Sequence, residues 1–153
     1  MSADLVANVV ISGVLTGLIY GLMALGLSVI FGVVRVVNFA HGEMMTIAMY
    51  AAVVLFASLR LDPFLAILPV AAAFFAFGYA MQAALINPFI TRPEHSQFML
   101  LVAVALIMVN GLLLAFGPDA RNVQTEYQLE SFALGPLLFD KARVFAAGAA
   151  LAA

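Results

Sequence analysis

The chain has 153 residues, of which 66% are hydrophobic and only 9% are charged. Soluble domains carry about a quarter charged residues, so this composition excludes an ordinary water-soluble fold and points to lipid as the solvent. The absence of cysteine excludes a disulfide framework, and a net charge of -2 gives no reason to expect a nucleic-acid partner.

The N-terminus lacks the features of a cleaved signal peptide. Residues 1–4 contain no basic residue, and the uncharged run that follows, residues 5–34, is 30 residues long. A signal-peptide core spans only ~7–15 residues. We therefore expect this first apolar segment to remain in the mature protein.

Charged residues divide the apolar sequence into segments long enough to cross a bilayer. A hydrocarbon core about 30 Å thick needs ~20 residues of helix, because lipid offers the backbone no hydrogen-bond partner. Residues 5–34 suffice for one long or tilted span. After Arg35 the next charge-free run, residues 44–59, has only 16 residues, so the second span is predicted over 39–59 and takes polar groups into the membrane boundary.

Two further spans follow. Arg60 and Asp62 mark a short turn, and Pro63 suits the first turn of a helix, so a third span is predicted over 63–85. Asn87-Pro88 and Arg92-Pro93 break the chain, and a fourth span is predicted over 96–116, ended by Gly117-Pro118. Within this span we expect Asn110 to form a hydrogen bond across helices.

The remaining sequence is predicted to be an extramembrane loop followed by an incomplete span. Residues 117–143 are polar, apart from a patterned apolar piece at 132–139. Residues 144–153 start another apolar run, but ten residues of helix reach only ~15 Å. We therefore expect four complete spans plus the start of a fifth in a single all-α membrane domain over 1–153; the alternative for 144–153 is an interfacial helix.

Small residues recur on one face of the first span. Gly13, Gly17 and Gly21 are spaced by four residues, which places them in one row along a helix. Such rows let membrane helices approach closely. We expect a packing seam here, either within the bundle or against a second subunit; the alternative is that glycine is simply common in membrane helices.

The densest polar group near a membrane boundary runs from Arg35 to Glu43. Ionisable residues at such a position tend to face a cavity or a partner. We take Asn38, His41 and Glu43 as candidates for a substrate pathway or gate, with Asn38 and His41 on one face if the segment is helical. Gly42 offers an alternative in which the helix loosens and its backbone binds substrate. The plainer interpretation places Arg35 and Glu43 among the headgroups and lets His41 cap a turn.

Other chemistry finds no support in the sequence. There is no Gly-rich loop followed by Lys and Ser or Thr, so ATP binding by a P-loop is not expected, and no catalytic residue, cofactor or metal site is predicted. His41 and Glu43 lack the further nearby ligands that a metal needs, and His95 is expected to be a solvated loop residue.

The run from Gly17 to Glu43, which ends in Asn38-Phe39-Ala40-His41-Gly42-Glu43, closely resembles the N-terminal signature of LivH-type permeases of branched-chain amino-acid importers. Arg92-Pro93 resembles a short loop of that family. The resemblance covers nearly the whole chain, strongly over residues 13–50 and loosely afterwards.

That resemblance implies the membrane subunit of an ATP-binding-cassette importer in the bacterial inner membrane. It implies as partners a second permease subunit, two cytoplasmic ATPase subunits and a periplasmic solute-binding protein, with the N-terminus and the loop 117–143 outside. Charge alone does not fix this orientation. Relatives are nearly twice as long and carry their ATPase-coupling segment in the second half, so the resemblance implies that the 153-residue chain lacks that segment.

Two other classes remain open from the sequence. One is a secondary transporter or channel, in which Glu43 is a proton or cation site. The other is an assembly subunit without transport, which uses the row of Gly13, Gly17 and Gly21 as its interface.

Overall fold

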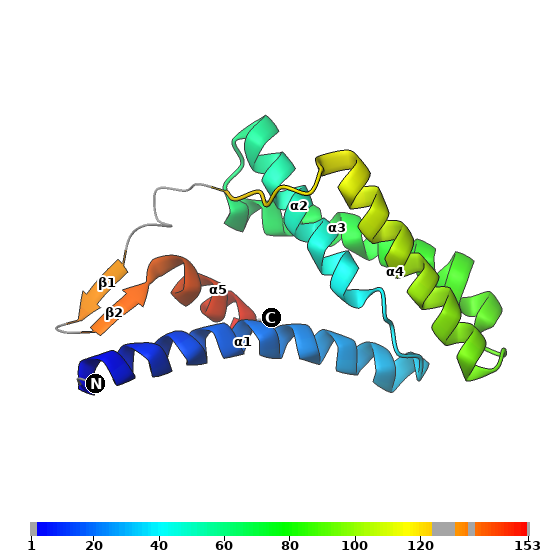
Figure 1. The fold of residues 1–153 in the computed structure, drawn as a ribbon, viewed down its shortest axis with the longest axis horizontal. Helices are drawn as coiled ribbons and strands as arrows, with labels where there is room; N and C mark the ends of the chain where they lie inside the picture. The colour runs from blue at the N-terminus through cyan, green and yellow to red at the C-terminus, as the bar shows by residue number, and fades with distance from the viewer. Residues whose placement is uncertain (1–2, 124–130, 135–136, 153) are drawn as a thin grey trace. The chain divides into compact units, whose positions relative to one another are not determined.

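The structure is a computed structural model, and it describes residues 3–123, 131–134 and 137–152. Its elements in chain order are five α-helices, a π-helical turn, a 3-10 turn and one hairpin: α1 (Ala3–Val34), α2 (His41–Leu59), α3 (Pro63–Met81), η1 (Gln82–Ile86), η2 (Asn87–Phe89), α4 (Glu94–Phe116), β1 (Ser131–Leu134), β2 (Leu137–Asp140) and α5 (Lys141–Ala152) (Figure 1).

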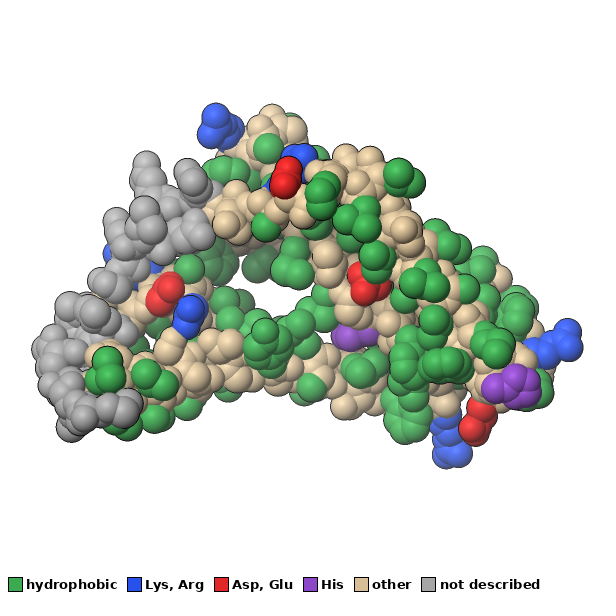
Figure 2. All heavy atoms as spheres, in the orientation of Figure 1, with side chains coloured by type: hydrophobic (Ala, Val, Ile, Leu, Met, Phe, Trp, Pro, Cys, Tyr) green, Lys and Arg blue, Asp and Glu red, His purple; other side chains and the backbone are tan. Residues whose placement is uncertain are grey.

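Within the described residues, four helical segments are long and apolar enough to cross a membrane: Leu5–Val34, His41–Leu59, Pro63–Phe89 and Glu94–Phe116. This confirms the expected all-α polytopic class. Few side chains of these segments are buried within the chain; Leu114, Phe75 and Val33 are 89%, 80% and 79% exposed. Figure 2 shows apolar side chains spread over the visible face and charged side chains at only a few places. So much exposed apolar surface is stable only against lipid or other protein.

The helices end where the sequence supplies stop signals. Asp62 caps α3 by accepting a hydrogen bond from the Phe64 N–H at 2.9 Å, and Pro63 occupies the first turn. Gly117, with φ of 77°, ends α4. Arg35 and Arg60 end α1 and α2 in the left-handed region, with φ of 56° and 54°.

By its contacts the chain divides into two units, one of residues 30–123 and one of residues 1–29 with 124–153. In the first unit α2 packs against both α3 and α4. Its core is a small apolar cluster contributed by the linker before α2, the end of α3 with η1, and α4: Val36, Ala40, Met81, Ile86, Leu101 and Met108. Outside this cluster, the rings of Tyr50 on α2 and Phe116 on α4 meet at 4.6 Å between centroids.

The third apolar segment does not continue as α-helix to its end. After Met81 the chain forms the wider π-helical turn η1. It then forms the tighter 3-10 turn η2. The Gln82 side-chain amide donates a hydrogen bond to Asn87 Oδ1 at 2.9 Å across this change. Ile86 is buried in the core, so the altered winding positions an anchoring side chain.

Polar side chains within the spans bond to their own helix. Ser28, Ser58 and Asn110 donate to the carbonyl four residues earlier, the last to Leu106 at 2.7 Å. Among the described residues no bond from Asn110 to another helix is seen, and the expected cross-helix bond stays a prediction. A carbonyl of the preceding turn is always within reach, whereas a partner on another helix has to be placed by packing.

The other unit contains the first 29 residues, the hairpin and α5. β1 and β2 pair antiparallel, with Phe132 opposite Phe139 and Ser131 opposite Asp140. The hairpin lies within the predicted loop 117–143, in its apolar piece; residues 124–130 and 135–136 of that loop lie outside the described part. Lys141 lies over the Phe132 ring at 4.8 Å, and Arg143 pairs with Asp140 at 3.6 Å and contacts Ser12.

Candidate functional site

The linker between α1 and α2 is not helical, and its residues 36–40 alternate between buried and exposed. Val36, Asn38 and Ala40 are buried, while the residues between them are exposed. Alternation with a period of two differs from the helical period of 3.6. The helical register considered for this segment is therefore wrong before His41, and two residues expected in the second span, 39 and 40, precede α2.

Asn38 explains why the helix does not start earlier. Its Oδ1 accepts a hydrogen bond from the Ala40 N–H at 3.1 Å, and its carbonyl accepts one from the His41 N–H at 3.1 Å. Asn offers the backbone this local turn in place of helix. The side chain is only 5% exposed, and its Nδ2 makes a weak contact with the Met44 sulfur at 3.7 Å. Asn38 thus joins the linker to the first turn of α2.

His41 begins α2 and carries a buried polar atom in its ring. The Nε2 atom is buried and has no hydrogen-bond partner among the described residues. An unsatisfied buried polar atom costs about 1–3 kcal/mol, so such an atom calls for an explanation. One explanation is a ligand or a protein group outside the described residues.

Glu43 lies in the first turn of α2 and is half-buried. A carboxylate near a helix N-terminus is stabilised by the backbone N–H groups there. Because successive helical residues are rotated by ~100°, His41 and Glu43 point to different faces of α2. The structure therefore brings Asn38 and His41 together and places Glu43 apart from them.

The remaining candidates are exposed. Cβ atoms added at Gly13, Gly17 and Gly21 would meet nothing within 4 Å, so the glycine row packs against nothing in the described part of the chain. Gly42 is in regular α-helix and its carbonyl accepts from Thr46, so this turn is not loosened. His95 is exposed in the first turn of α4.

A cavity beside the linker and a groove farther along α2 lie among the described residues, and neither is lined by Asn38, His41 or Glu43. One, of about 640 Å³, lies between the end of α1, the linker and the start of α4, and is lined by Arg35, Glu94, Gln97 and the rings of Phe31, Phe39 and Phe98. The other, of about 410 Å³, is an apolar groove lined by α2, α3 and Phe116. Arg35 and Glu94, which line the first cavity, lie far apart in the chain, so their meeting could not be predicted from the sequence.

Taken together, the described residues form a polytopic α-helical membrane domain with a buried polar turn at the start of its second span. Residues 9–153 match the protein family described as "Branched-chain amino acid transport system / permease component", and the chain belongs to that family. It is thus a multi-pass protein of the bacterial inner membrane.

A curated relative is similar in sequence. The chain is 26% identical over 123 residues to the "High-affinity branched-chain amino acid transport system permease protein BraD" of Pseudomonas aeruginosa. The alignment covers 75% of this chain and 40% of the relative, so the chain spans well under half of that protein's length. No solved structure matches the chain.

Proposed function

We propose that the chain is part of the membrane-spanning permease subunit of an ATP-binding-cassette importer for branched-chain amino acids or related small polar solutes. The family match over residues 9–153 carries this proposal. Its partners are a second permease subunit, two cytoplasmic ATPase subunits that hydrolyse ATP, and a periplasmic solute-binding protein. In this assignment the N-terminus and residues 117–143 lie outside the cell.

Within that function Asn38, His41 and Glu43 act in the pathway or its gate. Support comes from the buried Nε2 atom of His41, which is free of partners among the described residues and is held by the turn that Asn38 makes. A solute ammonium or carboxylate passing this turn finds a hydrogen-bonding group that the described fold does not use. Glu43 acts from the neighbouring face of α2, by attraction of an ammonium group.

The glycine row of α1 serves as an interface with another membrane helix. Support comes from the open space around Gly13, Gly17 and Gly21, which leaves room for a close backbone approach. The partner helix belongs either to the remainder of the permease or to the second permease subunit.

The test is uptake of radiolabelled leucine by host cells with and without the gene for this chain. Deletion is expected to abolish an uptake component that needs the ATPase subunits, and the restored gene is expected to recover it. Uptake that survives loss of the ATPases but collapses when the proton gradient is dissipated would instead assign a secondary transporter. A stable complex without any solute flux would assign an assembly role.

A further inference from the structure

The cavity of about 640 Å³ carries two opposite charges that are not paired with each other. Arg35 and Glu94 both line it and both are exposed. Neither side chain forms a hydrogen bond or an ion pair with any residue in the described ranges. A cation and an anion at one cavity, each without a protein partner there, suit a ligand that carries the complementary pair.

These two charges lie at the level of the lipid headgroups. Arg35 directly follows the apolar segment that ends at Val34, and Glu94 is the first residue of the segment that ends at Phe116. Charges at the ends of spans lie at the boundary between hydrocarbon and water. This places the cavity beside headgroups of one leaflet.

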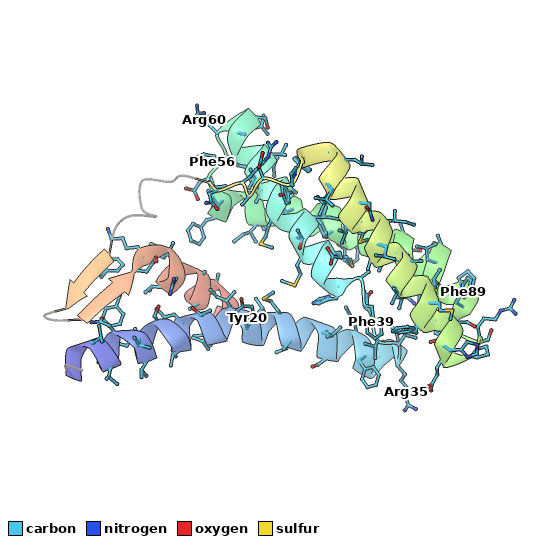
Figure 3. All side chains as sticks on the ribbon, viewed as in Figure 1. Tyr20, Arg35, Phe39, Phe56, Arg60 and Phe89 are labelled. Atoms are coloured by element: carbon cyan, nitrogen blue, oxygen red, sulfur yellow. The ribbon has the colours of Figure 1, made fainter. Side chains whose placement is uncertain are left out.

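Aromatic rings form the apolar side of the same cavity. The rings of Phe39 and Phe98 meet edge to face at 4.7 Å between centroids, and Phe31 lies one turn before Arg35 on α1. Figure 3 shows Arg35 and Phe39 near one another at the end of α1. The lining thus contains both charged and aromatic side chains, the two kinds of surface that a headgroup and its acyl chains contact.

The backbone at Arg35 is one that arginine rarely adopts. Its φ is 56°, in the left-handed region that non-glycine residues rarely adopt. Glycine would end the helix there without steric strain. Arg60 ends α2 with a φ of 54° but does not line this cavity. It therefore serves as a matched control for the effect of the backbone alone.

We propose that this cavity binds the headgroup of phosphatidylethanolamine, with the phosphate on Arg35 and the primary ammonium on Glu94. Guanidinium matches phosphate oxygens with two parallel hydrogen bonds, and a carboxylate accepts from an ammonium N–H. Phosphatidylglycerol has no ammonium for Glu94, and the quaternary nitrogen of phosphatidylcholine has no N–H to donate. The acyl chains run along the phenylalanine rings. This inference is independent of the transport proposal.

The experiment is lipid binding to the purified full chain in detergent, measured by native mass spectrometry with one lipid added at a time. Phosphatidylethanolamine is expected to bind more tightly than phosphatidylglycerol or phosphatidylcholine. Glu94→Gln should weaken its binding about tenfold, and Arg35→Gln, which loses two parallel hydrogen bonds to the phosphate, by more than that. Arg60→Gln should leave it unchanged, and Arg35→Lys should retain most of it.

Glu94→Gln has a second expected result, which distinguishes headgroup-specific binding from non-specific lipid binding. It should remove the preference for phosphatidylethanolamine over phosphatidylglycerol, whereas Arg35→Gln should weaken both lipids. Circular dichroism of each variant verifies that helix content is unchanged, and Arg35→Lys covers the case in which Arg35→Gln does not fold.

Three results would overturn the proposal. One is equal binding of all three lipids. Another is an equal loss of binding in Arg60→Gln and Arg35→Gln. The third is displacement of the lipid by free leucine, which carries the same pair of charges and would make the cavity an amino-acid site.

Discussion

Asn38 and His41 are neighbours in one turn, but their polar atoms are used differently. Asn38 is buried and supports the backbone at the start of α2, whereas the Nε2 atom of His41 is buried without a partner among the described residues. Replacing a residue that supports the fold lowers the stability of the protein. Replacing a residue that serves function at the expense of stability raises it.

Replacement of His41 by leucine should therefore separate stability from transport. His41→Leu removes an unsatisfied buried atom, so the free energy of unfolding should be unchanged or higher by about 1 kcal/mol. Leucine uptake should fall severalfold. Thermal unfolding in detergent and uptake in cells measure the two quantities. A His41→Leu variant that is destabilised and transports normally would make His41 a structural residue.

Asn38→Ala is the matching change, with the opposite expectation for stability. It removes the acceptor for the Ala40 N–H, so unfolding should become easier by about 1–2 kcal/mol. The same thermal measurement applies, with the exposed Asn110→Ala as a control, since its bond to Leu106 lies at the helix surface. An equal decrease in the free energy of unfolding in both variants would show that the hydrogen bond at Asn38 stabilises the protein no more than a surface hydrogen bond does.

The helix ends were the most predictable features among the elements. The segments run between charged and proline residues, so Pro63 and Phe116 could be assigned as helix termini from the sequence. The non-helical linker was not predictable, because an asparagine-made turn and a helical turn both fit Asn38 and His41 at a spacing of three. The choice between them depends on the burial of Val36 and Ala40, which is a tertiary effect.

Two irregular elements were missed for different reasons. The π-helical turn η1 accompanies the Gln82–Asn87 hydrogen bond and the burial of Ile86, and neither has a sequence signature. The hairpin did have a sequence signature. In the sequence Gly135-Pro136 separates the two strand segments, and Gly-Pro is a turn signal. The pathway residues were proposed from their type and position, but which of them share a face required the start of α2.

Removal of the cap of α3 should lower stability measurably. Asp62→Ala loses the acceptor for the Phe64 N–H, with an expected cost of about 1 kcal/mol. Asp62→Asn retains an acceptor oxygen and should cost much less. Thermal unfolding in detergent compares the two variants. Equal destabilisation by both would show that the charge of Asp62 matters rather than its capping bond.

The exposed apolar surface of the whole chain implies contacts beyond those described, and the glycine row is the best place to test them. Gly17→Ile should leave the isolated chain as stable as before, because a Cβ at residue 17 meets nothing within 4 Å. In cells it should reduce co-purification with the partner permease subunit severalfold. Gly111→Ile on α4, where the space is equally open, is the matched control. Equal association of both variants with the partner would remove the row from the interface.

The account depends most on the four apolar segments crossing a membrane. The chain has no cysteine, so single cysteines report the side of each connection without background. A membrane-impermeant maleimide applied to intact cells should label Leu61→Cys and Asp119→Cys, while Val37→Cys and Thr91→Cys should react only after the membrane is permeabilised. Equal labelling of all four positions in intact cells, or recovery of the unlabelled chain in the detergent-free soluble fraction, would contradict the membrane assignment.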